Sequence, residues 1–317
     1  MRLLVFVAAA LCTFGLHAQE FPTKPIRIIA PAAPGSGTDL AARIVGNELG
    51  AILKQPVIVE NKVGGGGAVG VGYVVKSPAD GYTLLLSTDA TVAIQKHVMP
   101  LHYDPLTDLA AIGEIGNFPL VLMTRGDSSI RSIEDLRQAA SAQTKGLSYG
   151  MGGQATGGHI VGETVRLSLK ANMTAVAYPS AARAVNDLLG GYVEVAVADT
   201  TAVSQVNSGK LRAIAVASSE RANCLPGVRT LSEQGVSFNL PYSYGLLAPA
   251  KTPPAVVATL NSALNKALKS AAVQQGLTQQ CVTPTSTNNS AEAFGARVRQ
   301  HYEQWGTYIR NAGIKIS

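Results

Sequence analysis

Short apolar runs rich in β-branched residues alternate with longer amphipathic stretches along most of this chain. The runs predict buried strands at residues 26–30, 57–60, 82–87, 120–124, 147–150, 173–178, 193–198 and 211–217. Between the first two runs, apolar residues recur at helical spacing behind Thr38 and Asp39, which are residue types that begin helices. Strands that alternate with helices form mostly parallel sheets covered on both faces. The pattern therefore predicts an α/β fold.

The C-terminal part of the chain has a different pattern. Residues 253–270 and 291–311 show long helical periodicity with few strand-like runs nearby. The first stretch begins at Pro253 and Pro254, which suit a helix start because the first N–H groups of a helix have no intrahelical acceptor. We expect both helices to pack on the outside of the protein.

The first residues are typical of a secretory signal peptide. Met1 and Arg2 form a short positive start, and the stretch from Leu3 to Leu16 is almost wholly apolar. Cleavage is predicted after Ala18, so that residues 1–18 are the signal. Beyond that point no apolar run approaches the roughly 18 residues that span a bilayer. The sequence therefore predicts a soluble, periplasmic mature protein.

Charge and cysteine content narrow the class of protein further. The formal net charge of +6 falls to +5 when Arg2 leaves with the signal. Lys and Arg are scattered and Trp305 is the only tryptophan, so no basic and aromatic stripe indicates nucleic-acid binding. Cys224 and Cys281 remain in a compartment where disulfides persist. A disulfide and two separate buried thiols are both compatible with the sequence, which provides no distances.

Two segments repeat one pattern of strand, loop and helix. The strand at 26–30 leads into residues 31–38, and the strand at 147–150 leads into residues 151–158. Both loops consist of small residues, and glycine allows close backbone approach. The unpaired N–H groups at a helix N-terminus favour an anion without Arg or Lys. If the two units lie in different lobes, they face each other across a cleft.

One short motif resembles that of a hydrolase. Residues 146–150 fit G-x-S-x-G, but a nucleophile elbow needs a strand up to the serine and a helix directly after it, and Ser148 falls inside a predicted strand. A triad also needs a later histidine. His159 is too close in sequence, and His301 lies on a predicted surface helix. An exported hydrolase that uses Ser148 remains an alternative function.

Other enzyme and metal motifs are weaker. Residues 65–70 fit G-x-G-x-x-G, but residues 61–63 separate the preceding strand from the first glycine, so a plain loop is favoured over a dinucleotide site. No spacing typical of a zinc or phosphate site occurs. The histidines of the mature chain are widely separated: His97, His102, His159 and His301. We predict neither a cofactor nor a metal.

Polar residues stand at the carboxyl ends of predicted strands, where α/β folds bind ligands. These residues are Ser87, Thr88 and Asp89 after one strand, Tyr178 after a second and Asp199 after a third. Helix capping is the commoner role for Ser, Thr and Asp. Their shared location nevertheless makes them candidate ligand-binding residues.

An ordered series of motifs resembles one protein family. The motifs lie at residues 21–27, 31–39, 59–62, 79–85, 103–105, 187–191, 208–213 and 312–315. Together they resemble the substrate-binding receptors of tripartite tricarboxylate transporters, the Bug-type family, over nearly all of the mature chain. The resemblance implies a type II periplasmic binding fold, in which crossover strands hinge two α/β lobes, and a protein that is not an enzyme.

The resemblance also implies a ligand and its site. Receptors of this family mostly bind carboxylic acids, including dicarboxylates, amino acids and aromatic acids, and present them to membrane subunits of the transporter. We expect a monomer with one lobe at 19–122 and 218–317 and the other at 123–217. A sensor receptor of the same fold is a further alternative. The implied ligand-binding residues are Ala33, Gly35, Ser36 and Thr38 in the first lobe and Met151, Gln154, Ala155 and Thr156 in the second, with Ser87, Thr88, Asp89, Tyr178 and Asp199 around them.

Three positions depart from the family pattern. Ala32 stands where Phe is usual, Asp89 where a small residue is usual, and Ser243 where Trp often precedes the Tyr-Gly at 244–245. The loss of two aromatic side chains implies a roomier pocket. Asp89 has two interpretations, a cap of the next helix or a partner for the positive group of an amino-acid ligand, because an unpaired buried carboxylate is costly.

Overall fold

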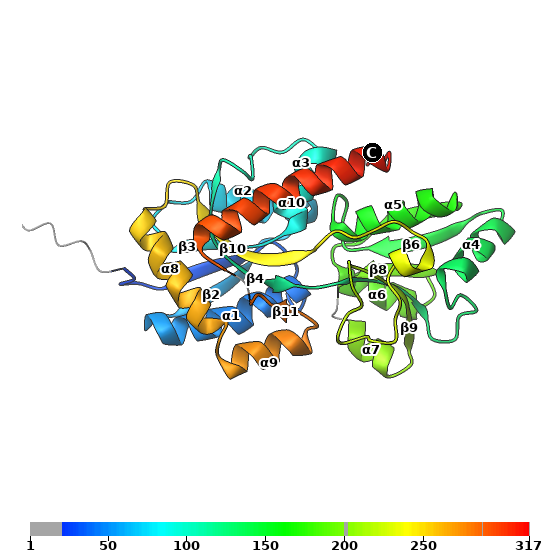
Figure 1. Ribbon diagram of the computed structural model, residues 1–317, viewed down its shortest axis with the longest axis horizontal. Coiled ribbons are helices and arrows are strands. Elements are labelled where there is room, and N and C mark those ends of the chain that lie inside the picture. The colour runs from blue at the N-terminus through cyan, green and yellow to red at the C-terminus, as the bar shows by residue number, and fades with distance from the viewer. Residues whose placement is uncertain (1–20, 200–201, 287, 317) are drawn as a thin grey trace, which may run out of the picture.

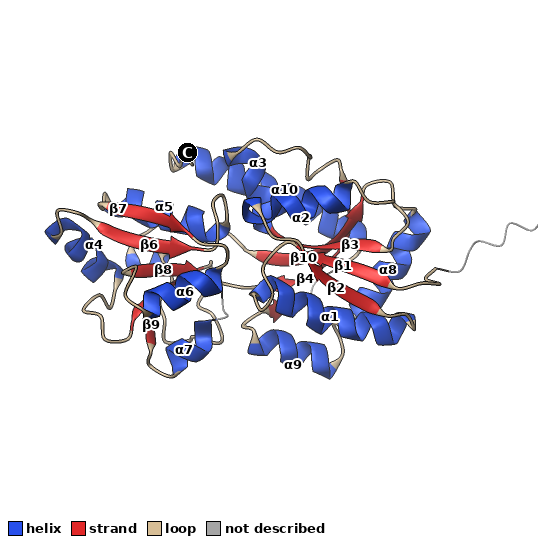
Figure 2. Cartoon of the chain, turned by 180° about the vertical axis from the view of Figure 1, so that it is seen from behind, coloured by secondary structure: helices blue, strands red, loops and turns tan. Residues whose placement is uncertain are grey.

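The computed structural model describes residues 21–199, 202–286 and 288–316, and these form two lobes that lie side by side (Figure 1). The first lobe contains a six-stranded sheet with the order β11-β4-β10-β3-β1-β2, and the second a five-stranded sheet with the order β7-β6-β8-β5-β9. Helices lie on both sides of each sheet (Figure 2). The predicted α/β fold with two lobes is confirmed.

The sheet of the first lobe is mixed. Its strands are β1 (Ile26–Ala30), β2 (Val57–Asn61), β3 (Thr83–Thr88), β4 (Leu109–Asn117), β10 (Ser243–Pro249) and β11 (Thr283–Pro284). β1 pairs in parallel with β2 and β3, whereas β10 runs antiparallel to β3 and β4, and β11 runs antiparallel to β4. The expectation of mostly parallel sheets is therefore wrong here, because β10, which the chain enters from the other lobe, runs antiparallel to both of its neighbours.

The helices of the first lobe follow the predicted periodicity with two differences. They are α1 (Gly37–Leu53), α2 (Ala68–Val75), α3 (Gln95–Val98), α8 (Pro254–Ala267), α9 (Ala271–Gln279) and α10 (Ala291–Asn311), with a 3-10 turn η1 (Gly65–Gly67) and a π-helix η2 (Ala90–Ile94). α1 begins at the N-cap Ser36, earlier than predicted. α8 and α10 are not purely external, because Leu260, Leu264 and Trp305 are fully buried.

The second lobe repeats the mixed arrangement. Its strands are β5 (Leu120–Arg125), β6 (Leu147–Met151), β7 (Met173–Ala177), β8 (Val195–Ala198) and β9 (Leu211–Ala217), and its helices are α4 (Ile133–Ala142), α5 (Gly157–Leu169), α6 (Ala181–Leu189) and α7 (Val203–Asn207). β6 is parallel to β7 and β8, and β5 is antiparallel to β8 and β9.

In the part of the chain that the structure describes, no helix has the length and apolar character needed to cross a membrane.

Two segments cross between the lobes and pair with each other. The first crossing lies between the end of β4 and the start of β5, and the second precedes β10. Phe118 N–H donates to the carbonyl of Tyr242 at 2.9 Å, and the Phe118 ring stacks on Tyr244 with a centroid distance of 4.0 Å. The chain thus passes from the sheet of the first lobe to that of the second between Asn117 and Leu120. The lobe boundary expected after residue 122 lies within β5. These paired segments are the hinge.

Cys224 and Cys281 form a disulfide, which resolves the alternative that the sequence left open. Cys224 packs against the hydrophobic cluster of the second lobe. Cys281 lies in the first lobe, between α9 and β11. The disulfide therefore links the lobes in addition to the two crossing segments.

Candidate ligand-binding site

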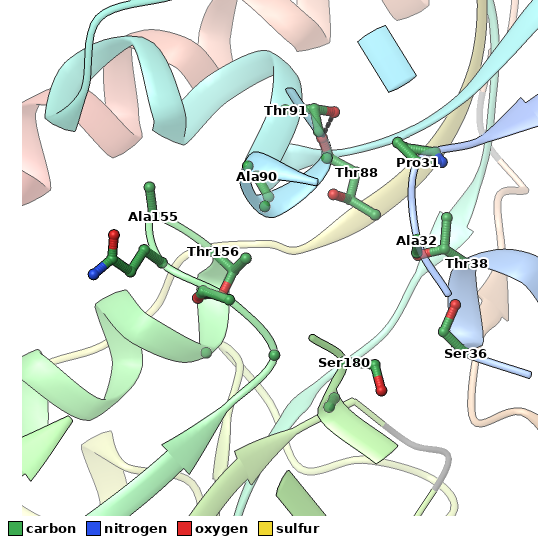
Figure 3. A pocket seen from close by; sticks show the side chains of 18 of the residues that line it. Pro31, Ala32, Ser36, Thr38, Thr88, Ala90, Thr91, Ala155, Thr156 and Ser180 are labelled. Atoms are coloured by element: carbon green, nitrogen blue, oxygen red, sulfur yellow. Dashed lines mark hydrogen bonds between the residues drawn. The ribbon is translucent and has the colours of Figure 1, made fainter. Parts of the chain in front are cut away.

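A cavity of about 700 Å³ lies between the lobes. Figure 3 shows Ser36 and Thr38 on one side of this cavity and Ala155 and Thr156 on another, with Thr88 and Ser180 also in its wall. The first pair comes from the loop after β1 and the start of α1, and the second from the loop between β6 and α5. The two repeated loops therefore face one another across a cleft.

Most of the residues proposed from the sequence line this cavity. They are Ala33, Ser36, Thr38, Thr88, Gln154, Ala155, Thr156, Tyr178 and Asp199. Four others are not part of its lining: Gly35, which is exposed, and the buried Ser87, Asp89 and Met151. Ser87 Oγ donates to the carbonyl of Gly245 at 3.1 Å, and Met151 is 1% exposed. Side chains alternate along a strand, so Ser87 and Thr88 point to opposite faces of β3.

The two repeated loops share one hydrogen-bonding scheme. In the first, Gly35 has a left-handed φ of 77° and its N–H donates to Asp39 Oδ2 at 2.9 Å. In the second, Ala155 has a left-handed φ of 55° and its N–H donates to His159 Nδ1 at 3.3 Å. Ser36 and Thr156 are the respective N-caps. In both loops the residue before the N-cap is thus held by a side chain four residues later.

The two side chains that hold these loops differ chemically. Burial alone would raise the pKa of Asp39, but hydrogen bonds from Arg43, Gly35 and Asn61 hold it below its usual value. Burial lowers the pKa of His159, and the nearby Glu163 offsets only part of this effect. At neutral pH the first loop is therefore held by a carboxylate and the second by a neutral imidazole.

A glycine run completes the cavity wall in the first lobe. Residues 64–67 all have positive φ and all line the cavity, directly before α2. The sequence pattern favours a plain loop here, although four successive glycines are themselves a signal of unusual backbone geometry. Ser180, the N-cap of α6, also lines the cavity. Several helix N-termini thus surround one space.

The lobes touch at the glycine run. A Cβ on Gly66 would lie 2.6 Å from the carbonyl oxygen of Gln154 in the opposite lobe. Gln95 Nε2 donates to the carbonyls of Gly65 and Gly66 at 3.0 Å and so supports the loop from behind. The two lobes therefore contact each other at this point.

Cationic side chains are missing from the described residues that line the cavity, and Asp199 is the charged residue among them. A Cβ on Gly37 would lie 2.8 Å from Asp199 Oδ2 and 2.6 Å from the Tyr244 hydroxyl, so both groups approach the start of α1. Burial raises the pKa of Tyr244 well above its usual value, and the charge of Asp199 adds to this effect. The tyrosine is therefore a neutral hydroxyl, and attraction for an anion must come from backbone N–H groups and hydroxyls.

Asp89 is paired within the protein. Its Oδ2 accepts hydrogen bonds from the N–H and the hydroxyl of Ser243 at 2.5 and 2.8 Å, and its Oδ1 lies 2.8 Å from His301 Nδ1. It makes no capping hydrogen bond to the following helix. His301 does not lie on an open surface as expected, because its side chain is 12% exposed. Asp89 and Ser243, two of the three positions that depart from the family pattern, thus contact each other.

Ser148 lacks the setting of a nucleophile. It lies within β6, and α5 begins only at Gly157. Its N–H and hydroxyl both donate to Glu194 Oε2 at 2.7 Å.

Across the described ranges, no cluster of His, Cys, Asp and Glu could hold a metal ion.

Comparison with known proteins identifies the family. The tripartite tricarboxylate transporter family receptor matches residues 41–314. The chain belongs to this receptor family. Protein BugT of Bordetella pertussis is 33% identical over 317 residues, which cover 98% of this chain and 96% of that protein.

Solved structures of similar receptors have the same fold. The periplasmic binding protein BugD has a TM-score of 0.85 at 30% identity, over 93% of this chain and 99% of that one. An R. palustris protein solved with adipate has a TM-score of 0.87 at 26% identity, again over 93% of this chain and 99% of that one. These solved proteins therefore share the two-lobed architecture of this chain.

Proposed function

We propose that this receptor captures a small carboxylate in the periplasm and presents it to the membrane subunits of a tripartite tricarboxylate-type transporter. One observation carries the proposal: loops at helix N-termini from both lobes line a single cavity whose described wall contains no Lys, Arg or His. Such termini favour an anion. The adipate in a similar receptor supports a carboxylate as ligand.

Closure of the lobes is the proposed mechanism. A ligand that contacts both lobes stabilises the closed form, and the transporter recognises that form. The proposed ligand contacts are the lining residues Ala33, Ser36, Thr38, Thr88, Gln154, Ala155, Thr156, Tyr178 and Asp199. The buried Ser87, Asp89 and Met151 support the wall from behind, and Gly35 shapes the loop before α1.

The protein is proposed to be a monomer that binds without catalysis and needs no cofactor or nucleic acid. Export would follow from the signal at residues 1–18, which lie outside the described residues. Hydrolysis at Ser148 is the alternative function, but the bond to Glu194 does not favour it. A sensor receptor differs from a transport receptor only in its partners, and pull-down with membrane fractions distinguishes the two.

A ligand screen by thermal shift tests the proposal. Mono- and dicarboxylates including adipate, together with amino acids, are compared with neutral analogues of the same length. A ligand at a hundredfold excess over its Kd should stabilise the folded protein by about 2.7 kcal/mol. The proposal is wrong if no acid binds. The hydrolase alternative is supported if an ester is hydrolysed and Ser148→Ala abolishes the activity.

A further inference from the structure

The loop of the second lobe contains a strained residue that needs support. Ala155 lines the cavity, is completely buried and has a left-handed φ of 55°. A residue with a Cβ is disfavoured in this region of φ and ψ. The equivalent residue of the first lobe is Gly35, which adopts φ of 77° without that penalty. The loop at 152–156 therefore depends more on its hydrogen bonds than the loop at 31–36.

His159 supplies the side-chain hydrogen bond that holds Ala155. Because the N–H of Ala155 is the donor in the 3.3 Å contact, His159 Nδ1 must carry a lone pair and no proton. His159 is 6% exposed, so water does not compete freely for this nitrogen. A proton on Nδ1 would place two N–H donors against each other.

We propose that His159 is a positioning residue for the ligand site, whose unprotonated Nδ1 holds the Ala155 amide and whose protonation releases the loop, so that ligand affinity falls on acidification. The affinity part of this inference rests on the proposed function, whereas the positioning part does not. Asp39 occupies the matching position in the first lobe and stays charged. Of the two loops, only the loop of the second lobe is therefore sensitive to pH.

The charged and titratable groups around His159 leave its imidazole neutral at neutral pH. Glu163 on the same helix is paired with Arg166 at 2.6 Å and accepts from the Tyr149 hydroxyl of β6 at 2.7 Å. Burial raises the pKa of Tyr149, which stays neutral. The hydroxyl of Tyr242, which directly precedes β10, accepts from the N–H of Gly157 at 3.4 Å, and burial also raises the pKa of this tyrosine. The net pKa of His159 lies below its usual value, so release occurs in the acidic range.

NMR of the ligand-free protein labelled with ¹⁵N tests the positioning role. The His159 ring should show an unprotonated Nδ1 near neutral pH, and the Ala155 amide signal should shift with the same midpoint at which the ring titrates. His159→Asn places an amide oxygen near the position of Nδ1, so the Ala155 signal should keep its wild-type position and lose its pH dependence. His159→Ala removes the acceptor, so the signal should move at every pH. A protonated Nδ1 at neutral pH, or an Ala155 amide that ignores the titration, would overturn the proposal.

Binding of adipate and of the strongest acid from the ligand screen tests the affinity part. The affinity of the wild type should fall by roughly 3- to 10-fold between neutral pH and a pH below the His159 midpoint, as expected for the loss of one hydrogen bond. His159→Asn should show only the change caused by ionisation of the acid itself, and His102→Asn, at an exposed histidine, should behave like the wild type. An affinity that rises on acidification, or an unchanged profile in His159→Asn, would contradict the inference. If no acid binds at any pH, the proposed function fails while the NMR result still decides the role of His159.

Discussion

The disulfide between Cys224 and Cys281 connects the hydrophobic cluster of the second lobe to the segment between α9 and β11 of the first. The hinge already joins the lobes through the paired residues Phe118 and Tyr242. Besides the two crossing segments of the chain, the disulfide is a third covalent connection between the lobes, and it limits how far they can separate. It also closes a long loop of the unfolded chain, because the two cysteines are 57 positions apart.

Replacement of both cysteines by serine should lower the free energy of unfolding. The chain-entropy model predicts a loss of about 4 kcal/mol for a loop of this length. Urea denaturation with and without reductant measures the effect, and the double variant should be insensitive to reductant. Small-angle scattering should also show a larger mean separation of the lobes in the ligand-free variant. Equal unfolding midpoints for the oxidised and reduced wild type would contradict this role.

Gly66→Ala should weaken closure. The new Cβ would lie 2.6 Å from the carbonyl oxygen of Gln154, and φ at this position is 62°. The left-handed conformation alone costs about 1–2 kcal/mol for a residue with a Cβ. We expect a more open form in small-angle scattering and weaker binding of the strongest acid from the screen. Gly72→Ala is the matched control, since a Cβ on Gly72 would meet no atom within 4 Å. Equal effects of the two substitutions would disprove contact between the lobes at Gly66.

His301→Gln should destabilise the protein more at low pH than at high pH. Burial alone would lower the pKa of His301, but the hydrogen bond and charge of Asp89 raise it above the usual value, with Glu114 adding to the increase and Arg297 opposing it. The contribution is therefore complete below the unfolded pKa of about 6.5 and is lost as the pH rises through the folded pKa. Urea denaturation at pH values below and above this range should show a cost of about 1–3 kcal/mol that shrinks on the alkaline side. A cost that grows with pH would refute the ion pair.

Trp305 should report closure through its fluorescence. It is the only tryptophan of the chain, is fully buried, and lies 5.9 Å from the Phe238 ring and 6.2 Å from the Tyr242 ring. Tyr242 also lines the cavity, so ligand binding should change the environment of the indole. Titration with the strongest acid should change the emission with the same Kd as calorimetry.

Trp305→Ala should cost about 3–5 kcal/mol of stability because a large core side chain is lost. A stable alanine variant would show that the ring does not pack as described.

Local patterns in the sequence identified the parallel part of each sheet correctly. β1 coincides with the predicted strand at 26–30, because a buried central strand reads as an unbroken apolar run. β4 and β10 are absent from the predicted strands, whereas β5 and β9, which are also antiparallel, are among them. β4 also contains Glu114 and two glycines, and β10 begins with a serine and ends with a proline, which obscures the strand pattern.

The sequence by itself determined the two helix-tip loops, because N-caps and left-handed turns are set by residues within four positions of one another. Tertiary structure alone decided which groups meet. Asp89 and His301 are 212 positions apart, and their pairing removes from the cavity a charge that the sequence offered as a ligand contact. Gly66 meets Gln154, and Cys224 meets Cys281, for the same reason. Distances between remote segments follow from packing of the whole chain, which no local pattern contains.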